Sequence, residues 1–170
     1  WNVATGMVIE GKAGFQIMGD WAKGEFTAAG KVPGVDYYCA PTPSNNGYLY
    51  NVDSFIFYKT SDPDKQEGQK LLAKLMMGKN FQKVFNLYKG SIPARLDVSM
   101  DEFDKCAKTS NSDIKTAGAS GGLVPSFAHG MAQGNTMKAA LQDVITEHFN
   151  SDMSSVDAAN ALADSVLDNM

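Results

Sequence analysis

The chain has 170 residues, 44% hydrophobic and 20% charged, a composition that supports a buried core and differs from that of a disordered tail or a fibre. Its net charge of −4 and its singly scattered Lys and Arg argue against a phosphate-binding stripe, so we expect no nucleic-acid partner. The longest apolar runs, such as residues 75–77, are too short to cross a bilayer.

Three segments have the composition of β-strands: residues 15–18, residues 37–40 and the aromatic, β-branched run at 48–58. Residues 41–47 contain two prolines and an Asn-Gly pair, which predicts a segment that crosses between two structural units. Three strands are few for an independent domain of this length. We therefore expect an α/β chain with part of its sheet missing.

Two helices are predicted in the middle of the chain. Asp62 and Pro63 offer a cap and a first-turn proline for a helix that Gly78 ends. Asn80 is expected to cap the next helix, which Lys89 and Gly90 stop. The apolar faces of the two helices contain Leu71, Leu72, Leu75 and Met76, and Phe81, Val84, Phe85 and Tyr88.

Three more helices are predicted in the second half. Ser99 and Glu102 have the spacing of a capping box, and in the helix they would open, Cys106 shares an inward face with Phe103 and Ala107. Cys106 should therefore be largely buried. Amphipathic patterns from residue 135 and from about 155 to 168 predict a C-terminal pair of helices.

The cysteines and histidines give little support for metal or catalytic chemistry. Cys39 and Cys106 are too far apart for a CxxC motif, and either two buried thiols or a disulfide fits them. His148 lies on the apolar side of a helix, where a structural role is favoured. His129 lies in a glycine-rich stretch, where a site role and a structural role are both open. We expect no metal and no cofactor.

Sequence motifs for nucleophilic, zinc-dependent or nucleotide-dependent catalysis are absent, including GxSxG, HExxH, the P-loop and the Rossmann fingerprint. An enzyme would have to use Asp20 and Asp53 as a carboxylate pair, or a histidine as general base. We therefore expect a protein that is not an enzyme.

Four residues at the ends of predicted elements have the chemistry of a sugar site, although each alone also has a structural interpretation. An aromatic ring covers the apolar face of a pyranose, while carboxylate, ammonium and imidazole groups bind its hydroxyls. In the full-length protein, Asp53 is expected to be more buried than Lys89. The four residues are Trp21, Asp53, Lys89 and His129.

Four segments, GKAGFQIMGDWAKGEF, NVDSFIFYK, LYKGSIPARLDV and VPSFAHGMAQG, occur in this order. They resemble the C-terminal portion of bacterial ABC-transporter sugar-binding proteins of the glucose/mannose-binding group, over essentially all of the chain. The resemblance implies a two-lobed α/β fold of the periplasmic-binding-protein type II, maltose-binding-protein-like class. Residues 1–47 and 94–170 would belong to the C-terminal lobe, and residues 48–93 would return to the N-terminal lobe.

The same resemblance implies roles for the four site residues. Trp21 would stack on the sugar, Asp53 would accept its hydroxyl protons, and Lys89 and His129 would supply the other polar contacts. The ligand would be a monosaccharide, with glucose as first candidate and mannose and galactose as alternatives. Another sugar or a disaccharide is the runner-up, and a glycoside-processing enzyme using Asp20 and Asp53 is the alternative from a different class.

The resemblance also implies a compartment and partners. The protein would be periplasmic, and because Trp1 is preceded by no signal-like segment, we expect the signal peptide to have been removed or to lie upstream. Partners would be a membrane permease and the missing N-terminal half. An oxidising compartment, an even cysteine count and the inward face assigned to Cys106 then predict a disulfide between Cys39 and Cys106.

Overall fold

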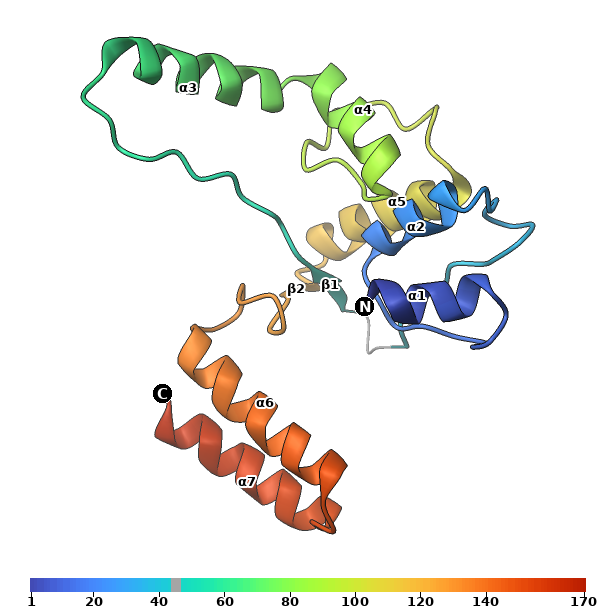
Figure 1. Ribbon diagram of the computed structural model, residues 1–170, viewed down its shortest axis with the longest axis vertical. Coiled ribbons are helices and arrows are strands. Elements are labelled where there is room, and N and C mark those ends of the chain that lie inside the picture. The colour runs from blue at the N-terminus through green and yellow to red at the C-terminus, as the bar shows by residue number, and fades with distance from the viewer. Residues whose placement is uncertain (44–46) are drawn as a thin grey trace. The chain divides into compact units, whose positions relative to one another are not determined.

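The structure, a computed structural model, describes residues 1–43 and 47–170 (Figure 1). These residues divide into two compact units, the first containing residues 1–43 and 52–121 and the second containing Gly47–Asn51 and Gly122–Met170. Helices and a short parallel sheet are both present, so the α/β class is confirmed. The two-lobed arrangement and its boundaries stay a prediction, and the proposed crossing segment at 41–47 lies partly outside the described residues.

The first unit is mainly helical, and its two central helices match the sequence patterns. Asp62 accepts hydrogen bonds from the backbone of the first turn of α3, next to Pro63. Gly90 ends α4 in the left-handed conformation, with φ of 89°. The elements are α1 (Asn2–Ile9), η1 (Asp20–Ala22), α2 (Lys23–Ala28), α3 (Pro63–Met76), α4 (Lys79–Lys89) and α5 (Lys105–Ala119).

Two predicted helix starts are wrong. The N-cap of α4 is Gly78 instead of Asn80, because the helix already begins at Lys79. Ser99 does not cap α5, because its hydroxyl bonds to Asp101 before the helix begins. Asp104 is the cap, and its carboxylate accepts a hydrogen bond of 2.8 Å from the backbone N–H at residue 107.

The strand predictions are confirmed only in part. Residues 15–18 and 37–40 form no strand, and Phe15 is 96% exposed. The run at 48–58 is a strand only over β1 (Tyr48–Tyr50), beyond which the chain continues to α3 without regular structure (Figure 1). A strand needs a neighbouring strand that pairs along its length, whereas the segment 37–40 forms only an isolated bridge between Tyr37 and Pro33.

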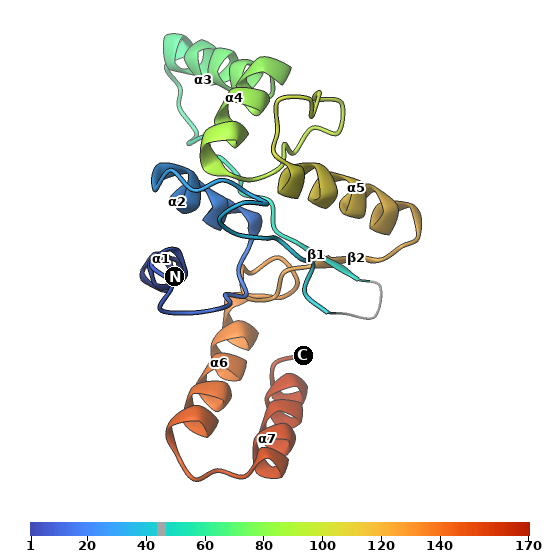
Figure 2. The same cartoon turned by 90° about the vertical axis from the view of Figure 1, so that its right-hand side faces the viewer.

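The second unit contains the sheet and the C-terminal helices. β1 pairs in parallel with β2 (Leu123–Pro125), a strand that the sequence patterns missed. The predicted helical pair is confirmed as α6 (Asn135–Asn150) and α7 (Ser155–Asp168), which lie side by side in both views (Figure 1 and Figure 2). Ser154 caps α7 by accepting the backbone N–H of Asp157.

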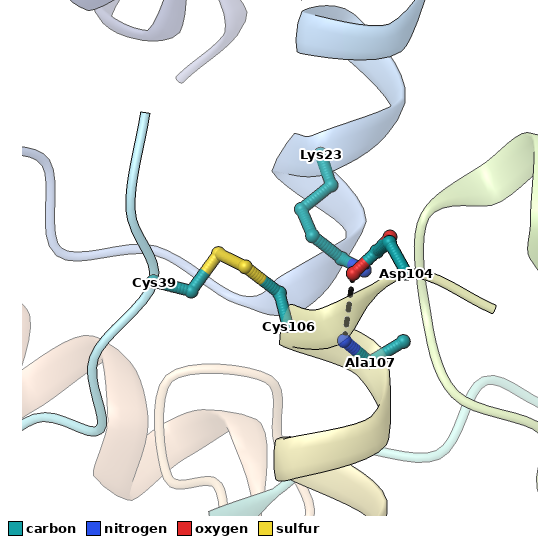
Figure 3. Close-up of a disulfide and its surroundings, with 5 residues drawn as sticks. All are labelled: Lys23, Cys39, Asp104, Cys106 and Ala107. Carbon is teal, nitrogen blue, oxygen red and sulfur yellow. Dashed lines mark hydrogen bonds and ion pairs between the residues drawn. A yellow bond between two sulfur atoms is a disulfide. The ribbon is translucent and has the colours of Figure 1, made fainter. Parts of the chain in front are cut away.

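A disulfide in the first unit joins Cys39 to Cys106 at the start of α5, which confirms the predicted pairing (Figure 3). The two Cα atoms are 5.7 Å apart, within the usual range. Cys106 is partly exposed, so the expectation that it would be largely buried is wrong, because its partner Cys39 lies at the surface. The neighbouring Lys23 ammonium is buried and lies 2.7 Å from Asp104 Oδ2 (Figure 3).

Candidate functional site

Trp21 is the middle residue of η1, a short helix that begins directly after the extended residue Gly19. Its side chain is partly exposed, so it is not a core residue of this unit. The indole ring occupies the position that a Cβ on Gly19 would need. Glycine is therefore required at position 19 for this orientation of the ring, which explains the glycine of the GDWA turn.

Asp53 and Lys89 come from distant parts of the first unit and form an ion pair. Lys89 is the last residue of α4, and its Nζ lies 2.5 Å from Asp53 Oδ2 and 5.7 Å from the centroid of the Phe85 ring. The Asp53 side chain is 65% exposed and that of Lys89 is 30% exposed. In this chain Asp53 is therefore the more exposed of the two, and the expectation that it is the more buried one in the full-length protein stays a prediction.

An open groove of about 540 Å³ runs along α4 beside this ion pair. The rings of Phe81 and Phe85 stack with their centroids 5.5 Å apart. The groove therefore combines a mainly apolar wall with an ammonium group at the C-terminal end of the helix. Its lining residues are Phe81, Val84, Phe85, Tyr88 and Lys89.

Asp20, the other carboxylate considered for catalysis, is engaged by the backbone. Its Oδ2 accepts a hydrogen bond of 3.0 Å from the N–H of Ile92. Burial raises the pKa of Asp20, and the Ile92 N–H, Lys23, the Ser91 side chain and Lys89 oppose that rise. Asp20 and Asp53 thus have different partners, Ile92 for one and Lys89 for the other.

His129 belongs to the second unit, in the loop between β2 and α6. Its Nδ1 shares a hydrogen bond of 2.6 Å with Oγ of Ser126, a residue that is only 2% exposed. The backbone of Ser126 is fixed in turn, because its N–H donates to the carbonyl of Tyr50 at 2.8 Å. With Nδ1 engaged, a hydrogen bond from His129 to a ligand would use Nε2.

Ser126 is a residue that the sequence reasoning missed. The available signal was its place three residues before His129 in a short loop, where a hydroxyl can reach the ring. His148 has the expected structural role, since its Nδ1 donates to the carbonyl of Met153 at 2.9 Å.

The described residues contain neither a metal-binding cluster nor a membrane-spanning helix. Within residues 1–43 and 47–170, no group of three or more His, Cys, Asp or Glu side chains could hold a metal ion. No helix in the same ranges is long and apolar enough to span a membrane.

Comparison with known proteins gives the relatives of this chain, although no family model matches it. It is 47% identical over 98% of its length to a probable sugar-binding periplasmic protein of Brucella suis biovar 1 (strain 1330). It is 44% identical over 98% of its length to a probable sugar-binding periplasmic protein of Rhizobium meliloti (strain 1021). It is also 34% identical over 86% of its length to an uncharacterized ABC transporter extracellular-binding protein of Pyrococcus horikoshii.

The chain spans about two fifths of the length of the curated relatives it matches, 39% of the Brucella suis protein and 40% of the Rhizobium meliloti protein. It is homologous over nearly all of its own length to probable sugar-binding periplasmic proteins and corresponds to a C-terminal portion of one. The resemblance seen in the sequence is thereby confirmed.

Proposed function

We propose that this chain, a C-terminal portion of a sugar-binding periplasmic protein, helps to capture a monosaccharide in an interlobe cleft for delivery to an ABC importer. Glucose is the first candidate, with mannose and galactose as alternatives. The fold would be the two-lobed type II fold, with residues 1–47 and 94–170 in the C-terminal lobe and residues 48–93 in the N-terminal lobe. The binding residues would be Trp21, Asp53, Lys89 and His129.

The observation that carries this proposal is the ion pair between Asp53 and Lys89 beside the aromatic groove of α4. A sugar hydroxyl both donates and accepts, and a carboxylate next to an ammonium can satisfy both roles of neighbouring hydroxyls. Aromatic rings supply the surface that the C–H face of a sugar requires. Both side chains retain exposure through which a ligand could reach them.

The partners would be the N-terminal portion of the same protein and a membrane permease. Exposed apolar side chains follow β1 and continue along α3, among them Phe55, Ile56, Tyr58, Leu71 and Leu75. An apolar surface of this extent is typical of an interface with further protein. The greater length of the relatives supports an N-terminal portion as its cover.

The hydrogen bond that the Asp20 carboxylate accepts favours a binding protein over an enzyme. A glycoside-processing enzyme would need one carboxyl group free to donate a proton and a second one free to act as base or nucleophile. The Asp20 carboxylate accepts the Ile92 N–H, and the Asp53 carboxylate faces the Lys89 ammonium. A binding role requires neither carboxyl group to be free, because Asp53 can accept a sugar hydroxyl while it faces Lys89.

Calorimetric titration of the full-length protein with glucose, mannose, galactose, xylose and maltose tests the function. We expect one monosaccharide to bind with a micromolar dissociation constant, about −8 kcal/mol, and no product to form during incubation with oligosaccharides. Absence of binding to every sugar, or release of a sugar product, would contradict the proposal.

Two substitutions test the site, and α4 itself provides their control. Asp53→Ala and Lys89→Ala should each weaken sugar binding at least about tenfold, since each removes charge-assisted hydrogen bonds. Lys83 and Glu102 form a pair with nearly the same exposures, 30% and 63%, away from the groove lining. Lys83→Ala should therefore leave the affinity unchanged, and an equal loss in all three variants would argue against the assigned site.

A further inference from the structure

Two sequence motifs that contain proposed ligand residues are joined in the first unit. GDWAKG, residues 19–24, contains Trp21, and YKGSI, residues 88–92, contains Lys89. The carboxylate of Asp20 accepts the N–H of Ile92 at 3.0 Å, although the two residues are 72 positions apart in the chain. The residue before Trp21 is thus bonded to the segment that follows Lys89.

A glycine contact joins the same two motifs at a second point. A Cβ on Gly24 would lie 2.9 Å from the carbonyl oxygen of Lys89, and a Cβ on Gly90 would lie 2.6 Å from the Gly24 nitrogen. Real Cβ atoms do not approach other atoms so closely, so both positions require glycine. The backbone of α2 and the end of α4 therefore touch with no side chain between them.

The surroundings of Asp20 make its hydrogen bond costly to lose. The carboxylate is largely buried, and the groups around it are Ile92, Ser91, Lys23 and Lys89. The Lys23 ammonium is already paired with Asp104 at 2.7 Å. The bond is partly buried, so an Ile92 N–H that lost its acceptor would be an incompletely solvated, unsatisfied donor, which costs free energy.

We propose that Asp20 is a positioning residue of the sugar site, which fastens the segment after Lys89 to the turn that holds Trp21. This inference rests on the proposed function. In the lobe division proposed above, Trp21 belongs to the C-terminal lobe and Lys89 to the N-terminal lobe, so the Asp20–Ile92 hydrogen bond joins the two lobes. Two ligand residues that are already held together lose less freedom when the ligand binds, and that smaller ordering cost increases affinity. Asp20 itself touches no sugar in this arrangement.

The test measures the Asp20–Ile92 hydrogen bond and the binding of sugar separately, in the full-length protein. Hydrogen–deuterium exchange of the Ile92 amide, followed by mass spectrometry, measures how well this hydrogen bond protects the N–H, and it needs no ligand. Asp20→Ala should speed this exchange about tenfold or more. Titration with the monosaccharide found for the wild type should show about tenfold weaker binding by Asp20→Ala.

Three further variants separate positioning from general stability. Asp20→Asn keeps an oxygen that can accept the Ile92 N–H and should recover most of the affinity. Gly24→Ala should weaken binding while Asp20 is intact, because its methyl group meets the Lys89 carbonyl. Asp62→Ala removes a carboxylate that accepts the backbone N–H of Asp64 at 2.9 Å, and should leave affinity unchanged.

The outcomes are distinguishable. A wild type that binds sugar together with an Asp20→Ala variant that folds and binds it equally well would overturn the positioning role alone. An exchange rate of the Ile92 amide that is the same in Asp20→Ala and in the wild type would overturn the role of the Asp20–Ile92 hydrogen bond. A wild type that binds no sugar would overturn the proposed function and the positioning role with it. If Asp20→Ala does not fold, a fall in affinity in Gly24→Ala supports the inference, and unchanged affinity there overturns it.

Discussion

The disulfide region, residues 20–39 and 103–107, and the open segment, residues 52–60, belong to the same unit but differ in how their side chains are covered. In the disulfide region Phe26 is buried and stacks on Tyr37, with ring centroids 4.2 Å apart, and Phe103 is buried nearby. In the open segment Ile56 is 78% exposed and its aromatic neighbours are exposed as well. The first region is stabilised by contacts within the chain, while the second requires cover from elsewhere.

The largest expected effect is loss of the disulfide. It joins residues 67 positions apart, and closing a loop of that length stabilises a fold by about 4 kcal/mol in the chain-entropy model. The double variant Cys39→Ser with Cys106→Ser should lose about that much free energy of unfolding in urea titrations. Reduction of the wild type should give the same loss, and a loss below about 1 kcal/mol would show that the surrounding packing suffices without the bond.

Ile56→Ala tests the open segment by comparing two lengths of protein. In the 170-residue chain the substitution removes an exposed side chain and should change the free energy of unfolding by less than about 0.5 kcal/mol. In the full-length protein, where we expect the N-terminal portion to cover Ile56, the cost should be about 2 kcal/mol or more. Equal effects in the two proteins would mean that the segment stays uncovered.

Tyr37→Phe tests how well the disulfide region is packed. The Tyr37 hydroxyl is buried without a hydrogen-bond partner in the described parts of the chain, and burial together with the Asp104 charge raises its pKa to about 12. Removing an unsatisfied hydroxyl while keeping the ring should stabilise the protein by about 1 kcal/mol in urea unfolding. Tyr38→Phe, at an exposed position, serves as the control, and destabilisation by Tyr37→Phe would reveal a partner for the hydroxyl.

The smallest effect concerns the pH dependence of Asp20. Burial raises its pKa above the ordinary value of 3.8, so the folded state holds its proton to higher pH than the unfolded state does. The contribution of Asp20 is therefore most favourable below pH 3.8 and declines as the pH rises through the raised pKa. Relative to Asp20→Asn, the wild type should gain stability on acidification from pH 7, and a relative loss would contradict the direction of the shift.

Local signals predicted the helices from α3 onward, missed α1 and predicted the strands poorly. Helix α3 follows from its cap and first-turn proline, and α6 and α7 follow from apolar periodicity; both signals depend on residues within a few positions of each other. The capping box at Ser99 failed because two positions offered a similar local cap, and Asp104 formed it. The strands at 15–18 and 37–40 failed because a strand depends on a partner segment, which propensity does not supply.

In the candidate site too, residue types could be predicted from the sequence, whereas contacts between distant residues could not. Sequence selected Trp21, Asp53, Lys89 and His129 from residue type and from the resemblance, and it also paired Cys39 with Cys106. It could not indicate that Asp53 faces Lys89 across 36 positions, or that Ser126 holds the imidazole of His129.

The sequence by itself indicated the resemblance to sugar-binding periplasmic proteins, the candidate ligand residues and those helices whose caps or periodicity are local. Only the tertiary structure decided the partners of the charged groups: Asp20 with the Ile92 N–H, Lys23 with Asp104, and Lys89 with Asp53. The physical reason is that a charge is stabilised by whichever group lies within hydrogen-bond reach, and folding brings such groups together from positions far apart in the chain.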